Sequence, residues 1–448
     1  MTFEIFKTFL KSGVIPGIGI LSVFSMASFG SGAVLSKPLN SLSPILFVPG
    51  YGMGALHVAV SNGRGEVANF DFLLPSMNPN SIFIPPLTSA KDYALTSGLR
   101  IKDLNRVSEW LKLNIAADGL AENQPGVEVT PISIGQNFAL ECPRYNGMMK
   151  ILASNGWVPN QNLKCIPFDY RFPPGETDFA EDLEIVIKKS VAAANGTKVT
   201  LACHSQGCLL AYHFLRTRSP EWLEEHVGLF FSLAGQFSGC SDCLRWAFQK
   251  GWGWDPNNDD AAPSDRTWVG ELALGLQTSV YGDQVLYRWG NENYRTTDTQ
   301  RLLREAGAWD VARATDRYAL ERQPWFQKGA VEHLPLSVPT RIVFGTKLLT
   351  TIGFEFQREG PVDPSCRDPL CAGPYYQDDP GKIQAEGDSG DSDWMNQAPR
   401  AWLTNPLCEI KELEFVSHMD IFENQEALQL LISTAREIPK VIDHCHKD

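Results

Sequence analysis

Short apolar runs, separated by amphipathic and polar stretches, recur along the chain from about residue 43. Uninterrupted runs of four to eight apolar residues are typical of strands that are buried on both faces of a sheet. The run at 43–50 ends in a Pro-Gly turn, and each later run is also bounded by turn-forming or polar residues. The pattern predicts strands at 43–50, 164–168, 199–203, 227–233, 341–345 and 412–416.

Helical periodicity follows several of these runs. Apolar residues at 183, 186, 187 and 191 recur at helical spacing, with Asp178 and Glu181 placed as a capping box and Asn195-Gly196 as the stop. Further helices are predicted at 208–215 and 425–438. Strands that alternate with helices in this way predict an α/β fold with a mostly parallel, doubly wound sheet.

Two segments interrupt the alternation of strands and helices. The polar stretch at about 52–100 is rich in proline and asparagine and is predicted to form an irregular lid. Residues 236–335 lack the alternation and are interpreted as a cap inserted into the core. We therefore expect one α/β domain over 34–448 with two insertions, because an insertion explains the length as well as a second domain does.

The N-terminus has the pattern of a targeting signal. Lys7 and Lys11 precede an apolar stretch at 14–29, and Ser31-Gly32-Ala33 offers a cleavage site between small residues. The stretch is shorter than the roughly 20 residues of a membrane-spanning helix. We predict a cleaved signal peptide at 1–33, with an uncleaved anchor as the alternative, and hence a secreted or lumenal protein of the lysosome, vacuole or endoplasmic reticulum.

Composition limits the partners. The formal net charge is −13 and no basic run occurs, so a nucleic-acid partner has no electrostatic support. Ten cysteines in an exported chain predict disulfides, and Cys366 and Cys371 are placed to close a local loop. Cys240 and Cys243 have CxxC spacing, but a single such pair is weak evidence for zinc or redox chemistry. We expect no cofactor and no metal.

Ser205 is the candidate nucleophile. It lies in His204-Ser205-Gln206-Gly207, a tight turn between a predicted strand and a predicted helix, which is the pattern of a nucleophile elbow. Small residues are needed around such a turn because the two backbones approach closely. Cys203 stands where a glycine is usual and is small enough for the turn. The alternative is a serine that caps an ordinary helix. Strand, elbow and helix together predict the α/β-hydrolase fold.

The general base is expected after Ser205 in the chain, with an acid between the two. Six histidines follow Ser205, and they are His213, His226, His333, His418, His444 and His446. Of these, only His418 lies in a loop between a late strand and the closing helix. The others lie on predicted helices, before the next core strand or in the polar tail. We therefore predict His418 as the base, against the alternative of a surface histidine.

The acid and the oxyanion donors are less sharply defined. Residues 386–393 offer three aspartates, of which Asp391 is preferred, with Asp388 and Asp393 as alternatives in a solvated acidic loop. Asp391 would orient His418 and stabilise the imidazolium. Main-chain N–H groups of Gln206, directly after the nucleophile, and of Tyr51, after the first strand, are the predicted oxyanion donors.

Several segments, in one order, resemble the lecithin:cholesterol acyltransferase family, including its lysosomal phospholipase relatives. The matching segments are Pro44-Ile45-Leu46-Phe47-Val48-Pro49-Gly50, Phe168-Asp169-Tyr170-Arg171-Phe172-Pro173-Pro174-Gly175, His204-Ser205-Gln206-Gly207-Cys208-Leu209, 338–345, Gly390-Asp391 and Ser417-His418. The block around Asp169 and Arg171 is the most distinctive. The chain departs from the family in having no cysteine before Cys142, where members carry a short disulfide loop in the lid.

The resemblance implies an enzyme that removes an acyl chain from a glycerophospholipid at a membrane or lipoprotein surface and passes it to water or an alcohol. It also implies Ser205, Asp391 and His418 as the triad, with Tyr51 and Gln206 at the oxyanion. Seven of the twelve tryptophans lie in the predicted cap, where they would either meet lipid or fill the cap's own core. A secreted triacylglycerol lipase or carboxylesterase is the alternative, and a catalytically inactive lipid-binding protein is the second.

Overall fold

The computed structural model describes residues 42–62, 65–73, 109–240, 243, 267–272, 281–305, 309–319, 338–356, 381–390, 400 and 402–438. Contacts divide the chain into Met1–Ser36 and Lys37–Asp448, and all described residues belong to the second unit. The predicted signal peptide therefore lies outside the described residues. In the part of the chain that the structure describes, no helix has the length and apolar character needed to cross a membrane.

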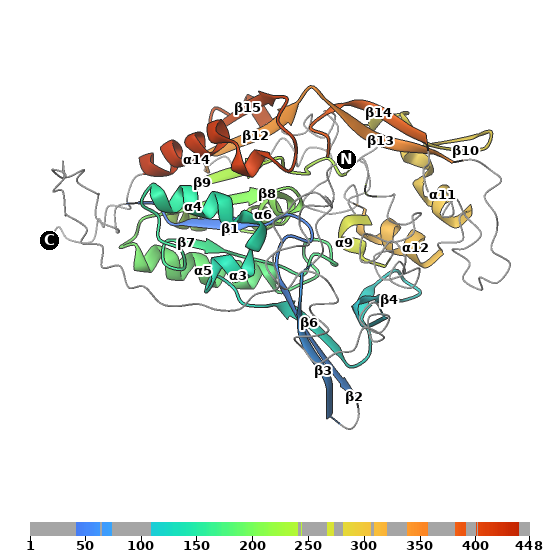
Figure 1. The fold of residues 1–448 in the computed structure, drawn as a ribbon, viewed down its shortest axis with the longest axis horizontal. Coiled ribbons are helices and arrows are strands. Elements are labelled where there is room, and N and C mark those ends of the chain that lie inside the picture. Colours follow the sequence, from blue (N-terminus) through green and yellow to red (C-terminus); the bar gives the residue numbers. More distant parts are fainter. Residues whose placement is uncertain are drawn as a thin grey trace, which may run out of the picture. The chain divides into compact units, whose positions relative to one another are not determined.

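The core is a six-stranded sheet in which every neighbouring pair is parallel (Figure 1). Its strands lie in the order β15-β12-β9-β8-β1-β7. They are β1 (Ile45–Val48), β7 (Leu163–Cys165), β8 (Val199–His204), β9 (Val227–Leu233), β12 (Thr340–Thr346) and β15 (Cys408–Glu414). All six predicted strands are confirmed, although the last begins four residues before its predicted start. Its sequence CEIKELE is more polar than those of the inner strands, in keeping with its place at the edge of the sheet.

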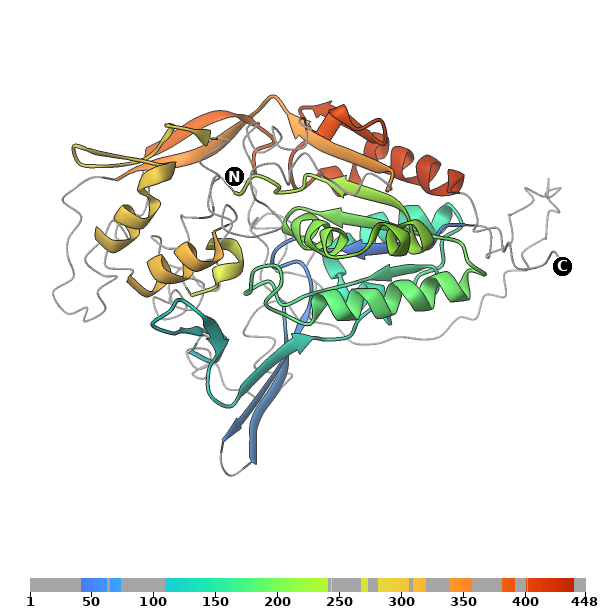
Figure 2. The same ribbon diagram turned by 180° about the vertical axis from the view of Figure 1, so that it is seen from behind.

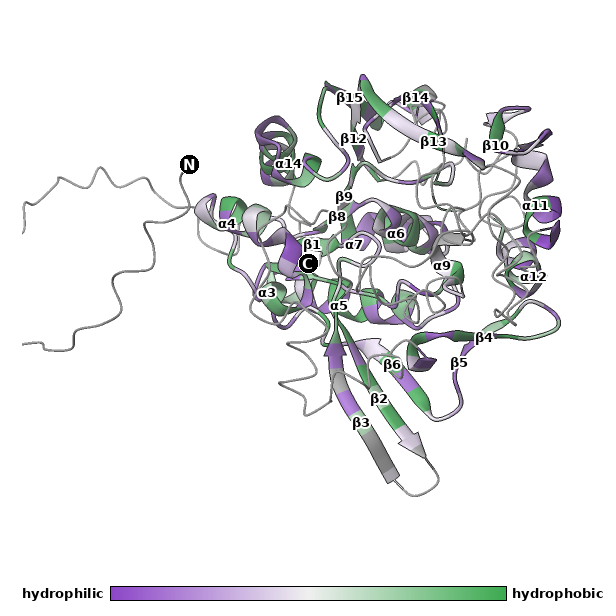
Figure 3. Cartoon of the chain, turned by 45° about the vertical axis from the view of Figure 1, so that its right-hand side comes forward, coloured by the Kyte–Doolittle hydropathy of each residue, from purple (hydrophilic) through white to green (hydrophobic). Residues whose placement is uncertain are grey.

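Helices cover both faces of this sheet. On β1, Leu46 and Val48 pack with α5 (Phe179–Ala193), α6 (Gln206–Arg216) and α7 (Pro220–His226). Ile45 and Phe47 point the other way, as alternation along a strand requires. They pack with α3 (Phe138–Glu141), α4 (Asn146–Ser154) and α14 (Gln425–Glu437). The predicted doubly wound α/β architecture is confirmed, and Figure 3 shows hydrophobic and hydrophilic residues side by side on the covering helices.

The helix before β8 begins at its predicted position without the predicted cap. Asp178 is the N-cap residue of α5, but its side chain makes no capping hydrogen bond, so the predicted capping box is wrong. The first turn still carries Glu181 and Asp182, whose negative charges interact favourably with the positive end of the helix dipole. The buried side chains of Leu183 and Ile187 hold the helix on the sheet.

The strand order reverses at β1. The chain adds β7 on one side of β1 and then crosses to add β8 on the other, followed by β9, β12 and β15 in sequence order. In an open parallel sheet, such a reversal leaves a crevice at the carboxyl ends of the two strands involved. Here the turn after β1, at Pro49-Gly50, and the turn after β8, at Ser205, meet at that crevice.

The segments beyond this edge contain regular structure that the sequence pattern did not predict. Within the predicted lid, β2 (Leu56–Asn62) and β3 (Gly65–Phe72) form an antiparallel hairpin, and β6 (Val127–Pro131) pairs with β2. The short strands β4 (Leu113–Ile115) and β5 (Ala121–Asn123) pair with each other. Residues 74–108 lie outside the described residues.

A second sheet has the order β11-β10-β13-β14. Its strands are β10 (Val285–Trp289), β11 (Glu292–Arg295), β13 (Leu348–Phe356) and β14 (Gly381–Gly387). Two of these strands lie within the predicted cap at 236–335, and two lie after it. Figures 1 and 2 show α11 (Thr299–Glu305) next to this sheet and α12 (Trp309–Tyr318) farther from it. Both helices follow η5 (Thr296–Asp298). Because β13 continues directly from β12, the second sheet starts at the edge where the parallel strands end.

Three disulfides link described cysteines, as the exported composition predicts. Cys142 and Cys165 join the end of α3 to β7, Cys203 and Cys208 join β8 to α6, and the CxxC pair forms the third. Cys366 and Cys371 lie outside the described residues. Among the described residues, Cys408 is a buried free thiol, and burial raises its pKa to about 11.

Candidate active site

Ser205 occupies a sharp turn between β8 and α6. Its backbone has φ of 54° and ψ of −131°, a conformation that L-residues seldom adopt outside strained turns. Gly207 allows the turn, because a Cβ atom at this position would lie 2.1 Å from the carbonyl oxygen of Pro49. The predicted strand, tight turn and helix are therefore present, and the side chain of Ser205 stands at the crevice of the sheet.

The cysteine at the usual glycine position has a partner. Cys203, on β8, forms a disulfide with Cys208 in the first turns of α6, with their Cα atoms 4.9 Å apart. Both side chains are fully buried. The cross-link encloses Ser205 and joins the two elements whose close approach forms the turn. The pairing was not predicted from the sequence, although the short spacing between Cys203 and Cys208 is compatible with a disulfide.

His418 lies in the loop between β15 and α14, as predicted, and faces Ser205. Its Nε2 atom is 2.9 Å from the Oγ atom of Ser205, a distance within hydrogen-bond range. The histidine is 8% exposed and the serine 6%, so both groups are shielded from bulk water. In this arrangement the imidazole can accept the hydroxyl proton through Nε2 if Nδ1 carries a hydrogen.

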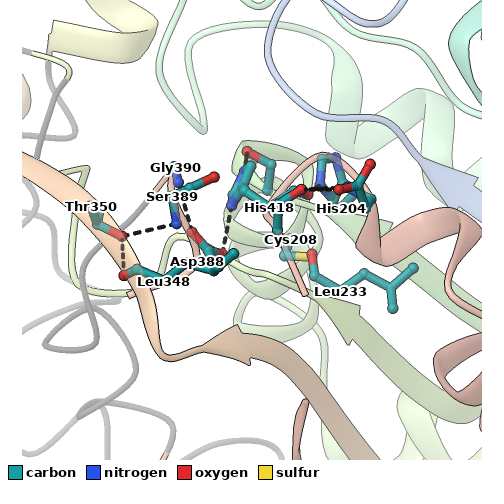
Figure 4. Close-up of polar contacts among 12 residues, drawn as sticks. His204, Cys208, Leu233, Leu348, Thr350, Asp388, Ser389, Gly390 and His418 are labelled. Atoms are coloured by element: carbon teal, nitrogen blue, oxygen red, sulfur yellow. Dashed lines mark hydrogen bonds and ion pairs between the residues drawn. The ribbon is translucent and has the colours of Figure 1, made fainter. Parts of the chain in front are cut away.

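Asp388 holds the other side of the imidazole (Figure 4). Its Oδ2 atom lies 3.0 Å from Nδ1 of His418, and the carboxylate is almost completely buried. The position expected for Asp391 is therefore occupied by the first of the two alternatives named from the sequence. Asp391 and Asp393 lie outside the described residues.

The loop that carries Asp388 is fixed by its own hydrogen bonds, several of which appear in Figure 4. Ser389 has φ of 68° and donates its main-chain N–H to Oγ1 of Thr350 on β13. Gly390 donates its N–H to Oδ1 of Asp388. A Cβ at Gly390 would lie 2.6 Å from that of His418, so the glycine is required by close approach. β14 ends one residue before Asp388. The weak alternation of residues 382–386 is the sequence signal for this strand, but it does not mark where the strand ends.

The two predicted oxyanion donors belong to segments that meet at Ser205. A Cβ at Gly50 would lie 3.0 Å from that of Ser205, which brings the turn carrying Tyr51 against the elbow. Gln206 is the first residue of α6, and N–H groups in a first helical turn have no carbonyl partner within the helix. The positive end of the helix dipole adds to this donor. The aromatic ring of Tyr51 packs edge-on against Tyr170.

The side chain of Gln206 ties the elbow to the cap. Its Nε2 donates to the carbonyl oxygen of Gly270 in α9 (Val269–Leu272), and Gly270 N–H in turn donates to the carbonyl of Arg171. The distinctive block noted in the sequence thus contacts α9, which lies in the segment interpreted from the sequence as a cap. Arg171 is fully buried, forms an ion pair with Asp169 and also donates to the Asn123 side chain and the Leu111 carbonyl.

The tryptophans of the predicted cap were expected either to meet lipid or to fill a core, and the described ones differ in exposure. Trp268 is fully buried, packs against Tyr170 and Phe72 and donates its N–H to the Leu111 carbonyl, so it belongs to the hydrophobic core. Trp309 is 57% exposed. Trp246, Trp252, Trp254 and Trp325 lie outside the described residues. Across the described ranges, no group of three or more His, Cys, Asp or Glu side chains is arranged to hold a metal ion.

Part of the sequence is similar to known acyltransferases. The model of the family "Lecithin:cholesterol acyltransferase" matches residues 110–251, which include Arg171 and Ser205. The resemblance to this family is confirmed. Human phosphatidylcholine-sterol acyltransferase (Homo sapiens) is 26% identical over 130 residues, which are 28% of this chain and 30% of that protein. Lecithin-cholesterol acyltransferase-like 1 of Arabidopsis thaliana is 28% identical over 136 residues, covering 26% and 32%.

These matches span about a third of the length of the acyltransferases. A solved structure titled as the Tle4–Tli4 complex covers 89% of this chain and 99% of its own, at a TM-score of 0.49 and 11% identity. The fold assignment rests on the molecule's own geometry. A doubly wound parallel sheet, an elbow serine at the strand-order reversal and a histidine after the last strand together make an α/β-hydrolase fold.

Proposed function

We propose that the chain is a serine lipid acylhydrolase or O-acyltransferase that acts on glycerophospholipids through an acyl-serine intermediate. Ser205 is the nucleophile, His418 the general base and Asp388 the acid that orients the base. The observation that carries the proposal is the continuous pair of contacts from Asp388 to His418 to Ser205, at 3.0 Å and 2.9 Å. Nucleophile, base and orienting group within hydrogen-bond reach are what acyl transfer requires.

The proposed reaction starts with proton transfer from Ser205 Oγ to Nε2 of His418 as the oxygen attacks the ester carbonyl. The buried carboxylate of Asp388 stabilises the imidazolium and keeps the hydrogen on Nδ1. The imidazolium then gives its proton to the leaving alcohol, and an acyl ester remains on Ser205. Water or an acceptor alcohol reacts with this ester in the second half, again with His418 as the base.

Main-chain N–H groups of Tyr51 and Gln206 stabilise the oxyanion in this proposal. The first helical turn supports Gln206, because its N–H groups and dipole favour negative charge. The hydrogen bond from the Gln206 side chain to Gly270 holds the same residue in place from the cap side. The position of α9 and the oxyanion site are therefore linked through one residue.

The choice of phospholipid as substrate rests on resemblance. The matched residues 110–251 include both the buried Arg171 block and the elbow, the two segments that most clearly resemble the acyltransferase family. Relatives named phosphatidylcholine-sterol acyltransferase support a lipid ester as the donor. Peripheral contact with a membrane or lipoprotein surface follows from such a substrate, and export after cleavage of residues 1–33 agrees with the three disulfides.

The deciding experiment combines product analysis with a nucleophile variant. Wild-type protein is incubated with mixed glycerophospholipid vesicles, with and without a sterol, and the products are identified by mass spectrometry. We expect released fatty acid or an acylated acceptor from wild type and none above background from Ser205→Ala, whose fold should remain intact. Equal activity of the two proteins would refute Ser205 as the nucleophile.

The same assay separates the alternatives. Release of fatty acid from triacylglycerol or a short ester, with phospholipids untouched, would indicate a lipase or carboxylesterase. A wild-type protein that binds vesicles but does not react with a fluorophosphonate probe would be an inactive lipid-binding protein. The acceptor is identified by comparing the products formed with and without sterol.

A further inference from the structure

Two side chains behind Ser205 and His418, those of His204 and Tyr145, link two main-chain groups through buried hydrogen bonds. His204, which directly precedes the nucleophile, lies with its Nε2 atom 2.9 Å from the main-chain carbonyl oxygen of His418 (Figure 4). Its Nδ1 atom lies 2.9 Å from the hydroxyl of Tyr145. The same hydroxyl lies 2.8 Å from the main-chain nitrogen of Gly50, in the turn that carries Tyr51.

The donor and acceptor of each of these hydrogen bonds follow from the main-chain carbonyl of His418 at one end. A carbonyl oxygen only accepts, so Nε2 of His204 carries the hydrogen and donates to His418. A neutral imidazole then has an acceptor at Nδ1, which takes the hydroxyl hydrogen of Tyr145. The Tyr145 oxygen is left to accept the Gly50 N–H. The sulfur of Met53 lies 2.9 Å from this oxygen, but a thioether is a much weaker acceptor than an imidazole nitrogen.

Burial keeps the side chains of His204 and Tyr145 uncharged. His204 and Tyr145 are both fully buried. Burial, followed by the proximity of His418, lowers the pKa of His204 well below its usual value, and burial raises the pKa of Tyr145. A single tautomer with a single set of donors therefore persists while His418 gains and loses its proton. The ring of Phe422 packs against the rings of both Tyr145 and His204.

We propose that Tyr145 and His204 are positioning residues that couple the oxyanion turn to the loop of the catalytic base. They touch neither substrate nor reacting atoms. Tyr145 fixes the N–H of Gly50 and selects the His204 tautomer that can hold the His418 main chain. The inference rests on the proposed function, because it assigns these residues a role in the same acyl transfer.

The physical consequence is a loss of alignment when either link is cut. Without the Tyr145 hydroxyl, the buried Gly50 N–H loses its acceptor and the turn with Tyr51 is free to shift. His204 also becomes free to place its hydrogen on Nδ1, which would set the Nε2 lone pair against the His418 carbonyl. A displacement near 1 Å in an active site can lower the rate by about 100-fold. Neither residue touches the substrate, so we expect the loss in kcat rather than in KM.

The test uses a fluorophosphonate probe that labels Ser205, together with turnover of a short water-soluble ester. For Tyr145→Phe we expect kcat and the maximal labelling rate to fall about 10-fold to 100-fold, with KM and probe affinity within about twofold of wild type. Tyr287→Phe is the matched control, since Tyr287 is equally buried in β10 of the second sheet. It should retain wild-type kcat.

A pair at His204 tests the tautomer argument and also covers the case that Tyr145→Phe does not fold. His204→Gln keeps an N–H donor that can reach the His418 carbonyl, whereas His204→Leu has none. We expect the glutamine variant to retain at least tenfold more kcat than the leucine variant at similar thermal stability. Equal rates for the two, or a wild-type labelling rate in a folded Tyr145→Phe, would overturn the proposal.

The result is distinguishable from failure of the proposed function. If wild-type protein does not react with the probe and has no ester turnover, Ser205 is not an active nucleophile and the proposed function fails first. If wild type reacts and the Tyr145 and His204 variants react equally fast, the acyl-transfer function stands and the coupling between Gly50 and His418 is refuted.

Discussion

Asp388 contacts His418 twice, once through its side chain and once through its main chain. The carboxylate faces Nδ1 of the imidazole, and the main-chain carbonyl accepts the N–H of His418 at 2.8 Å. The main-chain hydrogen bond holds the backbones of base and acid together independently of the side-chain contact. This double contact is the reason to place Asp388, rather than a neighbouring aspartate, in the proposed triad.

Replacement of the acid gives the first prediction. In Asp388→Asn the amide would donate toward Nδ1 and force the hydrogen of the neutral imidazole onto Nε2, where it blocks proton transfer from Ser205. We expect kcat for a soluble ester to fall about 10⁴-fold with the fold retained. Asp391→Asn and Asp393→Asn serve as controls and should stay within severalfold of wild type. A larger loss in either control would reassign the acid.

The nucleophile and the base are easier to predict from the sequence than the acid is. Ser205 and His418 follow from local pattern and chain order, because an elbow needs small residues and the base must follow the last strands. Choosing among three aspartates within six residues requires knowing where β14 ends and which residue then faces the imidazole. That depends on pairing between β13 and β14, which are joined through residues outside the described ranges.

The fold likewise has parts that the sequence predicts and parts that it does not. Parallel core strands were predictable because each is a continuous apolar run, as in Val227–Leu233. The second sheet was not, since Gly381–Gly387 reads GKIQAEG and is half exposed. The hairpin at Leu56–Phe72 does alternate, but its neighbouring proline- and asparagine-rich stretch suggested an irregular lid instead. Antiparallel strands at an exposed edge depend on pairing partners more than on their own sequence.

The elbow glycine provides the second prediction. In Gly207→Ala the new methyl group would meet the main-chain oxygens of Pro49 and Val48, which cannot move without shifting β1. We expect the free energy of unfolding to fall by about 1–3 kcal/mol and kcat to fall with it. Gly282→Ala is a useful control, because a Cβ there meets no atom within 4 Å. It should cost some stability through its φ of +55° but leave kcat unchanged.

The elbow disulfide gives the third prediction. Replacing Cys203 and Cys208 together with alanine removes a cross-link that closes a loop with a sequence separation of 5. We expect a loss of about 2 kcal/mol in the free energy of unfolding, measured by denaturant titration. The rate of phosphonate labelling should fall as well, because β8 and α6 are no longer held together around Ser205.

The matched control is the double alanine variant of Cys240 and Cys243, a disulfide of even shorter separation. It should lower stability by a similar amount without slowing the labelling of Ser205. If both double variants slow labelling equally, the effect reflects general destabilisation. If neither does, the elbow holds its shape without the cross-link.

The last prediction concerns acid stability and His213 on α6. Burial, followed by the charge of Arg218, lowers the pKa of His213 from 6.5 to about 4. Below pH 6.5 the unfolded chain binds a proton at this residue while the folded chain does not, so the free energy of unfolding decreases as pH falls from 6.5 toward 4. Below about 4 both states are protonated and this contribution no longer changes.

His213→Gln removes the titrating group, so its stability should depend less steeply on pH between 6.5 and 4 than that of wild type. Urea unfolding at a series of pH values measures the two slopes, and His57→Gln, at a half-exposed position on β2, is the control. Parallel curves for wild type and His213→Gln would mean that His213 is protonated in the folded protein. His204 is also buried with a lowered pKa, so part of the wild-type slope should persist in the variant.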